Sequence, residues 1–253
     1  MLAFLSPAKS LDYQRPAPAF ATTTPRFAED AARLAAAAAR IGAKKLGELM
    51  HISDKLATLN ADRFTHFADA EERAALYAFN GDVYLGFEAR SLDDAAIAFA
   101  QDHVRILSGL YGLLRPLDTI RPYRLEMGTR WAPGRHRTLY EHWGTRVSDA
   151  IAADLADAGT NIILNLASQE YWGVVAQHPP AGARIITVDF KDNGPKGLRF
   201  NSFAAKRARG MMARWMCEHH ITTPDALQAF DSDGYAFAAD RSEEDRWLFV
   251  RER

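Results

Sequence analysis

The segment "NIILNLASQEYWGVVA", residues 161–176, decides the fold class because it places a strand directly before a short helix. Its first half holds four apolar residues in a run of strand type, and its second half favours a helix. Residues 138–159 predict one long amphipathic helix closed by Gly159, and residues 183–193 and 197–202 predict two strands joined by a turn. Strands and helices therefore mix without strict alternation, which predicts an α/β or mixed α+β domain.

The rest of the chain supports the same class. The other expected elements are a buried strand at 2–6, a helix at 27–42, an extended segment at 81–87, a helix at 91–103 with Ser91 as N-cap, a helix at 203–219 and a hairpin of 235–240 with 246–252. On the helix at 203–219, one arc is expected to face the core and carries Ala204, Ala208, Met211 and Trp215.

Length and composition allow one large domain or two small ones, and the absence of a repeat and of an obvious linker favours a single domain over residues 1–253. A chain of 253 residues, 48% of them hydrophobic, can bury about 70 to 75% of its unfolded surface. The one cysteine, Cys217, excludes an intramolecular disulfide and is expected to be structural. The start of the chain lacks a signal-peptide pattern, and no run is long and apolar enough to span a membrane. We therefore expect a cytoplasmic protein with no membrane contact.

The net charge of −1 conceals two basic segments. Residues 105–137 hold seven arginines against two acids, and residues 184–214 hold eight lysines and arginines against two acids. If the segments meet in the fold, they form one basic face, which is typical of proteins that bind polyanions. The alternative is that these cations are solvated or pair with the acidic remainder of the chain.

Polar residues stand where several predicted strands end. Asn165, Ser168, Glu170 and Tyr171 follow one strand, Asp189 and Lys191 end another, and Lys9 follows the first. Proteins of the α/β class place ligands at the carboxyl ends of their strands. Such residues also serve as ordinary caps, so this pattern leaves both readings open.

Residues 48–57, "ELMHISDKLA", are similar to a helix-hairpin-helix element, in which a short hairpin presents backbone amides to a phosphate. Ile52, Lys55 and Ala57 match that pattern, but His51 and Ser53 stand where glycines are usual. Side chains at these positions restrict positive φ and close approach to a phosphate. A merely structural helix turn remains the alternative.

Common catalytic and metal-binding signatures are absent from the sequence. It contains no HExxH, CxxC, P-loop, GxGxxG or GxSxG motif. We therefore expect no metal and no cofactor, and the sequence alone assigns no catalytic residue.

Taken together, seven stretches of this chain closely resemble the YaaA family of bacterial peroxide-stress resistance proteins, and the similarity runs from Met1 to the C-terminal strands. The stretches are "LSPAKSLD", "ISDKLATLN", "FNGDVYLG", "LSGLYGLLRPLDTIRPYRLEMGT", "NLASQEYW", "FKDN" and "AKRARGMMARW". The resemblance implies a cytoplasmic protein that helps cells survive hydrogen peroxide by limiting free intracellular iron. It also implies one compact α/β fold of uncommon topology, with a helix-hairpin-helix element and a basic cleft that binds double-stranded DNA.

Carried onto this chain, the resemblance places the hairpin at residues 50–55 and implies a set of phosphate-binding side chains. These are Lys9, Lys55, Arg115, Arg121, Arg124, Lys191, Lys206 and Arg209. The guanidinium of arginine stays charged and grips phosphate with two donors, while Pro116 and Pro122 stiffen the backbone beside Arg121 and Arg124.

Three hypotheses for function follow. The first is a DNA-binding protein of the peroxide response, without known catalytic activity, that contacts phosphates and so recognises shape rather than sequence. The second is an enzyme acting on a nucleotide or another phosphorylated small molecule in the same cleft, with acid-base groups drawn from Lys9, Glu126, Ser168, Glu170 and Asp189. The third, direct sequestration of iron, lacks ligands in the sequence. The sequence identifies no protein partner.

Overall fold

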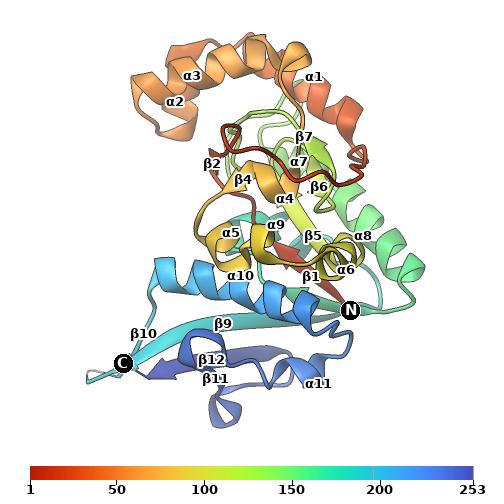
Figure 1. Ribbon diagram of the computed structural model, residues 1–253. Coiled ribbons are helices and arrows are strands. Elements are labelled where there is room, and N and C mark those ends of the chain that lie inside the picture. The colour runs from red at the N-terminus through yellow and green to blue at the C-terminus, as the bar shows by residue number, and fades with distance from the viewer. Residues whose placement is uncertain (196, 253) are drawn as a thin grey trace.

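The computed structural model describes residues 1–195 and 197–252, and its main feature is a mostly parallel sheet (Figure 1). The order of its strands is β11-β12-β9-β8-β1-β5-β6, with β10 paired to β9. The strands are β1 Leu2–Leu5, β5 Val104–Ser108, β6 Gly112–Leu114, β8 Ile162–Asn165, β9 Arg184–Gly194, β10 Gly197–Arg199, β11 Tyr235–Phe237 and β12 Arg246–Glu252. The mixed α/β class expected from the sequence is confirmed.

The central strands β12, β9, β8, β1 and β5 run parallel, so their carboxyl ends meet at one edge of the sheet. The chain leaves β1 toward β5 on one side and leaves β8 toward β9 on the other. Neighbouring strands whose connections diverge in this way open a crevice between their carboxyl ends. The topology therefore marks the ends of β1 and β8 as a place for a ligand.

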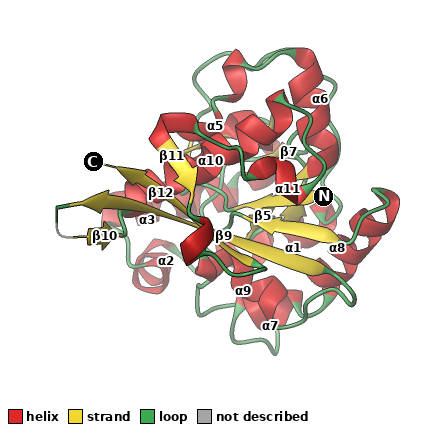
Figure 2. Ribbon diagram, turned by 90° about the horizontal axis from the view of Figure 1, so that it is seen from below, coloured by secondary structure: helices red, strands yellow, loops and turns green. Residues whose placement is uncertain are grey.

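Helices cover both faces of the sheet. Figure 2 shows α5, α6 and α10 on one side of the strands and α7, α8 and α9 on the other. The helices are α1 Ala28–Ala39, α2 Ala43–Met50, α3 Asp54–Thr65, α4 Ala75–Ala78, α5 Asp82–Phe87, α6 Asp94–His103, α7 Leu139–Trp143, α8 Arg146–Asp157, α9 Gln169–Ala176, α10 Ser202–Glu218 and α11 Pro224–Leu227. Short pairs β2 Ser10–Leu11 with β4 Phe79–Asn80, and β3 Arg73–Ala74 with β7 Thr119–Ile120, lie outside the main sheet.

The segment at 81–87, which we expected to be extended, is the helix α5, so that prediction is wrong. The reason lies in its packing against α10, where glycines let the two helices approach closely. A Cβ atom on Gly86 would lie 2.1 Å from the carbonyl oxygen of Arg207, and one on Gly210 would lie 1.8 Å from that of Val83. The helical state of α5 thus depends on a partner far along the chain.

Three further details differ from the sequence-based expectation. The predicted long helix at 138–159 is divided into α7 and α8 at Gly144, whose φ is 51°. The N-cap of α6 is Asp93 instead of Ser91, and its side chain accepts a hydrogen bond of 2.8 Å from the amide of Ala96. The buried face of α10 is rotated from the predicted arc, and its buried residues are Ala205, Ala208, Gly210, Met212, Ala213, Met216 and Cys217.

The other expected elements are confirmed, including the first strand, the hairpin of β11 and β12, and the pairing of β9 with β10. Buried apolar residues from all of the central strands form one hydrophobic cluster. The assignment of residues 1–253 to a single domain stays a prediction. Within residues 1–195 and 197–252, no helix has the length and apolar character that crossing a membrane requires.

Candidate functional site

A pocket of about 1060 Å³ lies at the carboxyl ends of β1 and β8, at the point that the topology marks, and beside the middle of β9. We call it the strand-end pocket. Its lining comes from residues 6–10 after β1, residues 165–172 from the end of β8 into α9, the start of α5, the middle of β9, the start of β12 and one side of α10. Asp189 and Lys191 were expected at a strand end, but β9 continues to Gly194, so that placement is wrong. Because α9 and α10 cover opposite faces of the sheet (Figure 2), the pocket draws on both faces.

The floor of the pocket is fixed by bonds between the segments that follow β1 and β8. Ser6 Oγ accepts a hydrogen bond of 2.9 Å from the amide of Ser168 and lies 3.3 Å from Ser168 Oγ, to which it donates. Asn165 Oδ1 accepts a bond of 3.0 Å from the amide of Ala167, and Tyr84 donates to the carbonyl oxygen of Ser6 over 3.1 Å. Ser6 and Asn165 are buried, so this floor is rigid.

Glu126 joins the pocket to residues 115–130, "RPLDTIRPYRLEMGTR", which we call the Arg-Pro segment. Its Oε1 lies 3.0 Å from Lys9 Nζ and 2.8 Å from Arg124 Nη2. Two residues further on, the amide of Gly128 donates a bond of 3.1 Å to Glu170 Oε1, on the first turn of α9. The Arg-Pro segment therefore supports the strand-end pocket, and its acidic residue binds two of the predicted phosphate-binding cations.

Three cations that line the pocket have no ion pair within the described residues: Lys191 on β9, and Lys206 and Arg209 on α10. Arg209 Nε is buried without a hydrogen-bond partner, and burial lowers the pKa of this guanidinium. Lys206 Nζ lies 5.9 Å from the ring centroid of Phe203. Unpaired cations that line one pocket are suited to binding an anion there.

Acidic side chains also line the pocket, and most of them have partners. Asp189 binds Arg246 at 3.1 Å, and Asp245 binds Arg184 at 2.7 Å. Asp82, at the start of α5, has no ion pair within the part of the chain that the structure describes. The lining is therefore mixed in charge.

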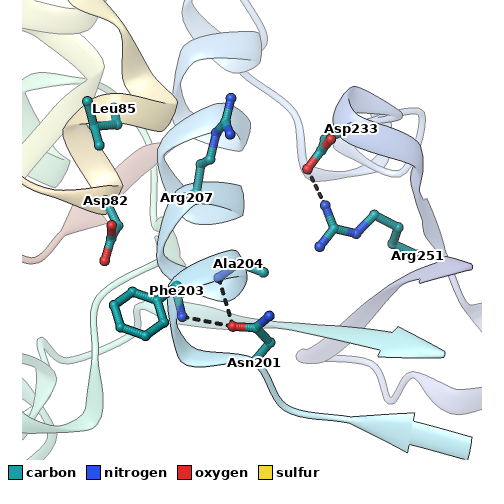
Figure 3. Close-up of a pocket in the computed structure, with 8 residues that line it drawn as sticks. All are labelled: Asp82, Leu85, Asn201, Phe203, Ala204, Arg207, Asp233 and Arg251. Atoms are coloured by element: carbon teal, nitrogen blue, oxygen red, sulfur yellow. Dashed lines mark hydrogen bonds and ion pairs between the residues drawn. The ribbon is translucent and has the colours of Figure 1, made fainter. Parts of the chain in front are cut away.

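A smaller pocket of about 530 Å³ lies on the outer side of α10 (Figure 3). Its lining includes Asp82, Leu85, Phe203 and Arg207, and the side chain of Asn201 caps α10 there by accepting bonds from the amides of Phe203 and Ala204. A single turn of α10 therefore presents Lys206 and Arg209 to the strand-end pocket and Arg207 to this smaller one.

The remaining predicted phosphate ligands lie elsewhere. Arg115 Nη2 binds Asp102 at 2.8 Å, and Arg121 Nη2 binds Glu72 at 3.0 Å; neither arginine lines the strand-end pocket. The structure therefore brings together Lys9, Lys191, Lys206 and Arg209, with Arg124 attached through Glu126. It does not bring Arg115, Arg121 or Lys55 to that pocket.

The predicted hairpin is a tight connection between α2 and α3, with Lys55 exposed in the first turn of α3. His51 adopts the left-handed conformation, with φ of 51°, although we expected its side chain to restrict positive φ. Ser53 is the N-cap residue, in extended conformation. Figure 1 shows α2 and α3 well separated from β9 and α10, so the hairpin is a second, distant surface.

Sequence reasoning missed several lining residues. Ser6 could have been found, because it is the polar last residue of the predicted first strand at 2–6. Phe200, Asp82 and Arg246 carried no such signal, because α5, β10 and β12 reach the pocket only through long-range packing. Within residues 1–195 and 197–252, no group of three or more His, Cys, Asp or Glu side chains is placed to hold a metal ion.

Comparison with known proteins identifies relatives over the whole length. The family model described as "Peroxide stress protein YaaA" matches residues 1–241. A UPF0246 protein of Rhizorhabdus wittichii is 66% identical over 253 residues, which is all of both chains. UPF0246 proteins of Paracidovorax citrulli and Neisseria meningitidis serogroup B are 48% and 46% identical, each over 99% of this chain and 98% of the relative.

Proposed function

The chain belongs to the YaaA family of peroxide stress proteins, and from this premise we propose that it protects cells from peroxide by binding the phosphates of double-stranded DNA. In this proposal the protein acts in the cytoplasm and also limits free intracellular iron. Lys191, Lys206 and Arg209 supply the main contacts, and Lys9 and Lys55 add further ones.

The observation that carries the proposal is the group of unpaired cations at the strand-end pocket. Most basic residues of the Arg-Pro segment already bind carboxylates, whereas Lys191, Lys206 and Arg209 have no such partner within the described residues. A buried guanidinium nitrogen without a hydrogen bond is unfavourable, and a bound phosphate oxygen would remove that penalty. Phosphate contacts carry no sequence information, so we expect binding to depend on DNA shape.

Lys9 and Lys55 extend the contact surface in different ways. The side chain of Lys9 is 57% exposed, so it can turn from Glu126 toward a phosphate at little cost. Lys55 lies in the first turn of a helix, where backbone amides also attract anions. Because α3 and α10 are far apart, a duplex that contacts both has to span the molecule (Figure 1).

The salt dependence of duplex binding tests this proposal. Replacing Lys191 and Lys206 by alanine should remove roughly two phosphate contacts and flatten the salt slope of log affinity by about 1.8. The matched control is the Arg135→Ala, Arg137→Ala double variant, which changes the net charge equally at exposed positions outside the strand-end pocket. Equal losses in the two variants would show diffuse attraction only and would contradict a specific phosphate site.

A second candidate function is an enzyme that acts on a nucleotide or another phosphorylated small molecule. The observation that favours it is the presence of Glu170, Asp189 and the Ser6–Ser168 hydroxyl pair beside the cations. Carboxylates and hydroxyls that line the same pocket as an anion-binding group are suited to acid-base chemistry on the bound anion. Affinity for a small ligand with few charges would change far less between 50 and 200 mM salt than affinity for a duplex, so the same titration separates the candidates.

The effect on iron is tested in cells. We expect a strain that lacks this protein to hold more chelatable iron during peroxide exposure than the same strain carrying the wild-type gene, as measured by electron paramagnetic resonance. The Lys191→Ala, Lys206→Ala variant should fail to lower that signal if the phosphate site is needed. If this variant lowers the chelatable-iron signal as far as the wild type does, iron limitation does not depend on the phosphate site.

A further inference from the structure

The charges around the strand-end pocket are of both signs and come from different faces of the sheet. Lys206 and Arg209 project from α10, whereas Glu170 belongs to α9 on the opposite face (Figure 2). One oxygen of Glu170 accepts the amide of Gly128, and the structure gives its other oxygen no partner within the described residues. Asp82 is likewise an unpaired acceptor.

A run of DNA backbone does not explain these acceptors. Carboxylates only accept hydrogen bonds, and phosphodiester oxygens also only accept, so the two repel each other. Nucleobases, in contrast, carry amino groups that donate. A ligand that matches this pocket is anionic at one end and a hydrogen-bond donor at the other, as a nucleotide is.

The rim of the pocket carries an aromatic face that nothing in the described structure covers. Phe200, in the connection between β10 and α10, is 64% exposed and lines the strand-end pocket. Exposed aromatic rings beside cations are typical platforms for unpaired bases, and each stacked base contributes about 1 to 3 kcal/mol. Phe203 is 70% exposed, but it lines the neighbouring pocket and not the strand-end pocket (Figure 3).

The size of the pocket agrees with a single unit of nucleic acid. Its volume of about 1060 Å³ is slightly larger than the range of roughly 300–1,000 Å³ found for small-molecule sites, so it has room for one nucleotide. Its floor, at Ser6 and Asn165, is buried, whereas Lys206 and Phe200 at the rim are exposed. A duplex surface can contact the rim, but only a displaced or free nucleotide can fill the floor.

We propose that the strand-end pocket is a subsite for one nucleotide unit, with the phosphate on Lys191, Lys206 and Arg209, the base against Phe200, and its donors toward Glu170. This rests on the proposed function in taking nucleic acid as the ligand. The nucleotide has two sources, an unpaired residue within a DNA strand or a free nucleotide.

Fluorescent 2-aminopurine distinguishes these sources. The wild-type protein is titrated with a matched duplex containing 2-aminopurine, with the same duplex carrying it as a single-nucleotide bulge, and with free 2-aminopurine deoxyribonucleoside monophosphate. We expect the bulged duplex to bind at least about 5-fold more tightly than the matched one, the lower bound for one stacked base. We also expect the emission to change only when the base is unpaired or free.

Two pairs of variants locate the subsite. Phe200→Ala should abolish the preference for the bulge, while Phe203→Ala should keep it, because Phe203 lines the other pocket. Arg209→Gln should weaken binding of the free nucleotide, while Arg207→Gln, on the same helix but facing the neighbouring pocket (Figure 3), should not. Equal thermal unfolding temperatures for all four variants would exclude folding defects.

The outcomes separate this inference from the proposed function. Equal wild-type affinities for both duplexes, with no fluorescence response to free nucleotide, would overturn the subsite, and a steep salt slope would then leave duplex binding intact. A response to free nucleotide that depends on Phe200, with neither duplex bound, would uphold the subsite and contradict the DNA proposal. Loss of the preference in both phenylalanine variants would also overturn the assigned position of the base.

Discussion

Lys9 Nζ lies 3.0 Å from Glu126 Oε1, and this pair joins the segment after the first strand to the Arg-Pro segment more than a hundred residues later. The same oxygen accepts from Arg124 Nη2 at 2.8 Å. The side chain of Glu126 is only 12% exposed, so its charge is held close to both cations. Two predicted phosphate ligands are therefore occupied by one carboxylate in the unbound protein.

This arrangement predicts that Glu126→Gln strengthens duplex binding. Lys9 already contributes in the wild-type protein, so freeing Arg124 adds at most one further phosphate contact, and the salt slope of log affinity should steepen by up to about 0.9. The measurement is a fluorescence titration of one duplex at several salt concentrations. Asp157→Asn is the control, because Asp157 is exposed, distant from the pocket and equal in charge. An equal gain in both variants would mean that only net charge matters.

The hairpin between α2 and α3 yields a separate prediction. Lys55→Ala should weaken binding of all duplexes by a similar factor and flatten the salt slope by about 0.9, because it removes one phosphate contact without base readout. Lys44→Ala is the matched control, since Lys44 is exposed at the opposite end of α2. Unchanged affinity of the Lys55 variant would make this hairpin an ordinary helix turn.

Cys217 is expected to be inert in the folded protein. It is fully buried on α10, and burial raises the pKa of its thiol well above the ordinary value. Because the thiolate is the reactive form, native protein should resist both N-ethylmaleimide and hydrogen peroxide. Mass spectrometry should detect modification only after unfolding in denaturant. A sulfenic acid formed at Cys217 in native protein would instead indicate a redox sensor.

Sequence patterns predicted the central strands because β1 and β8 carry continuous apolar runs, which suit strands buried on both faces. They failed for α5, a helix of only six residues whose glycine permits contact with α10. They also missed the break at Gly144, because local amphipathic character continues through it. These features depend on distant partners, which a local pattern does not contain.

The residues of the candidate site, like the helices and strands, were predictable from the sequence only in part. Lys9 was recognisable after the first strand, and Lys206 and Arg209 as bases beside the core face of one helix. Lys191 was also selected, as a strand-end residue, although β9 continues past it to Gly194. The charge pattern did not separate these from Arg115 and Arg121, whose carboxylate partners Asp102 and Glu72 were not assigned from the sequence. The choice between a free cation and a paired one is made by tertiary contacts.

His142 should make folding stability depend on pH. Burial, reinforced by nearby Arg146 and His136, lowers the pKa of His142 to about 4, and its Nε2 is buried without a partner. The unfolded chain takes up the proton near pH 6.5, so the unfolding free energy should fall between pH 6.5 and 4, with about 1 to 2 kcal/mol from this partly exposed ring. The free energy of unfolding, measured with urea, should depend less on pH in the His142→Gln variant than in the wild type. Equal pH dependence in the two proteins would contradict this prediction.

The contact between α5 and α10 predicts that Gly210→Ala destabilises the protein and displaces the pocket. A Cβ atom there would lie 1.8 Å from the carbonyl oxygen of Val83, so the helices have to separate, at a cost of about 1 to 3 kcal/mol in unfolding free energy. Gly47→Ala is the matched control, because its Cβ would meet the Ala57 side chain at 3.3 Å and alanine favours the helix. Since Arg209 adjoins Gly210, duplex affinity should fall in the first variant only. Urea unfolding and duplex titration measure both effects, and unchanged stability of Gly210→Ala would contradict the close packing of α5 on α10.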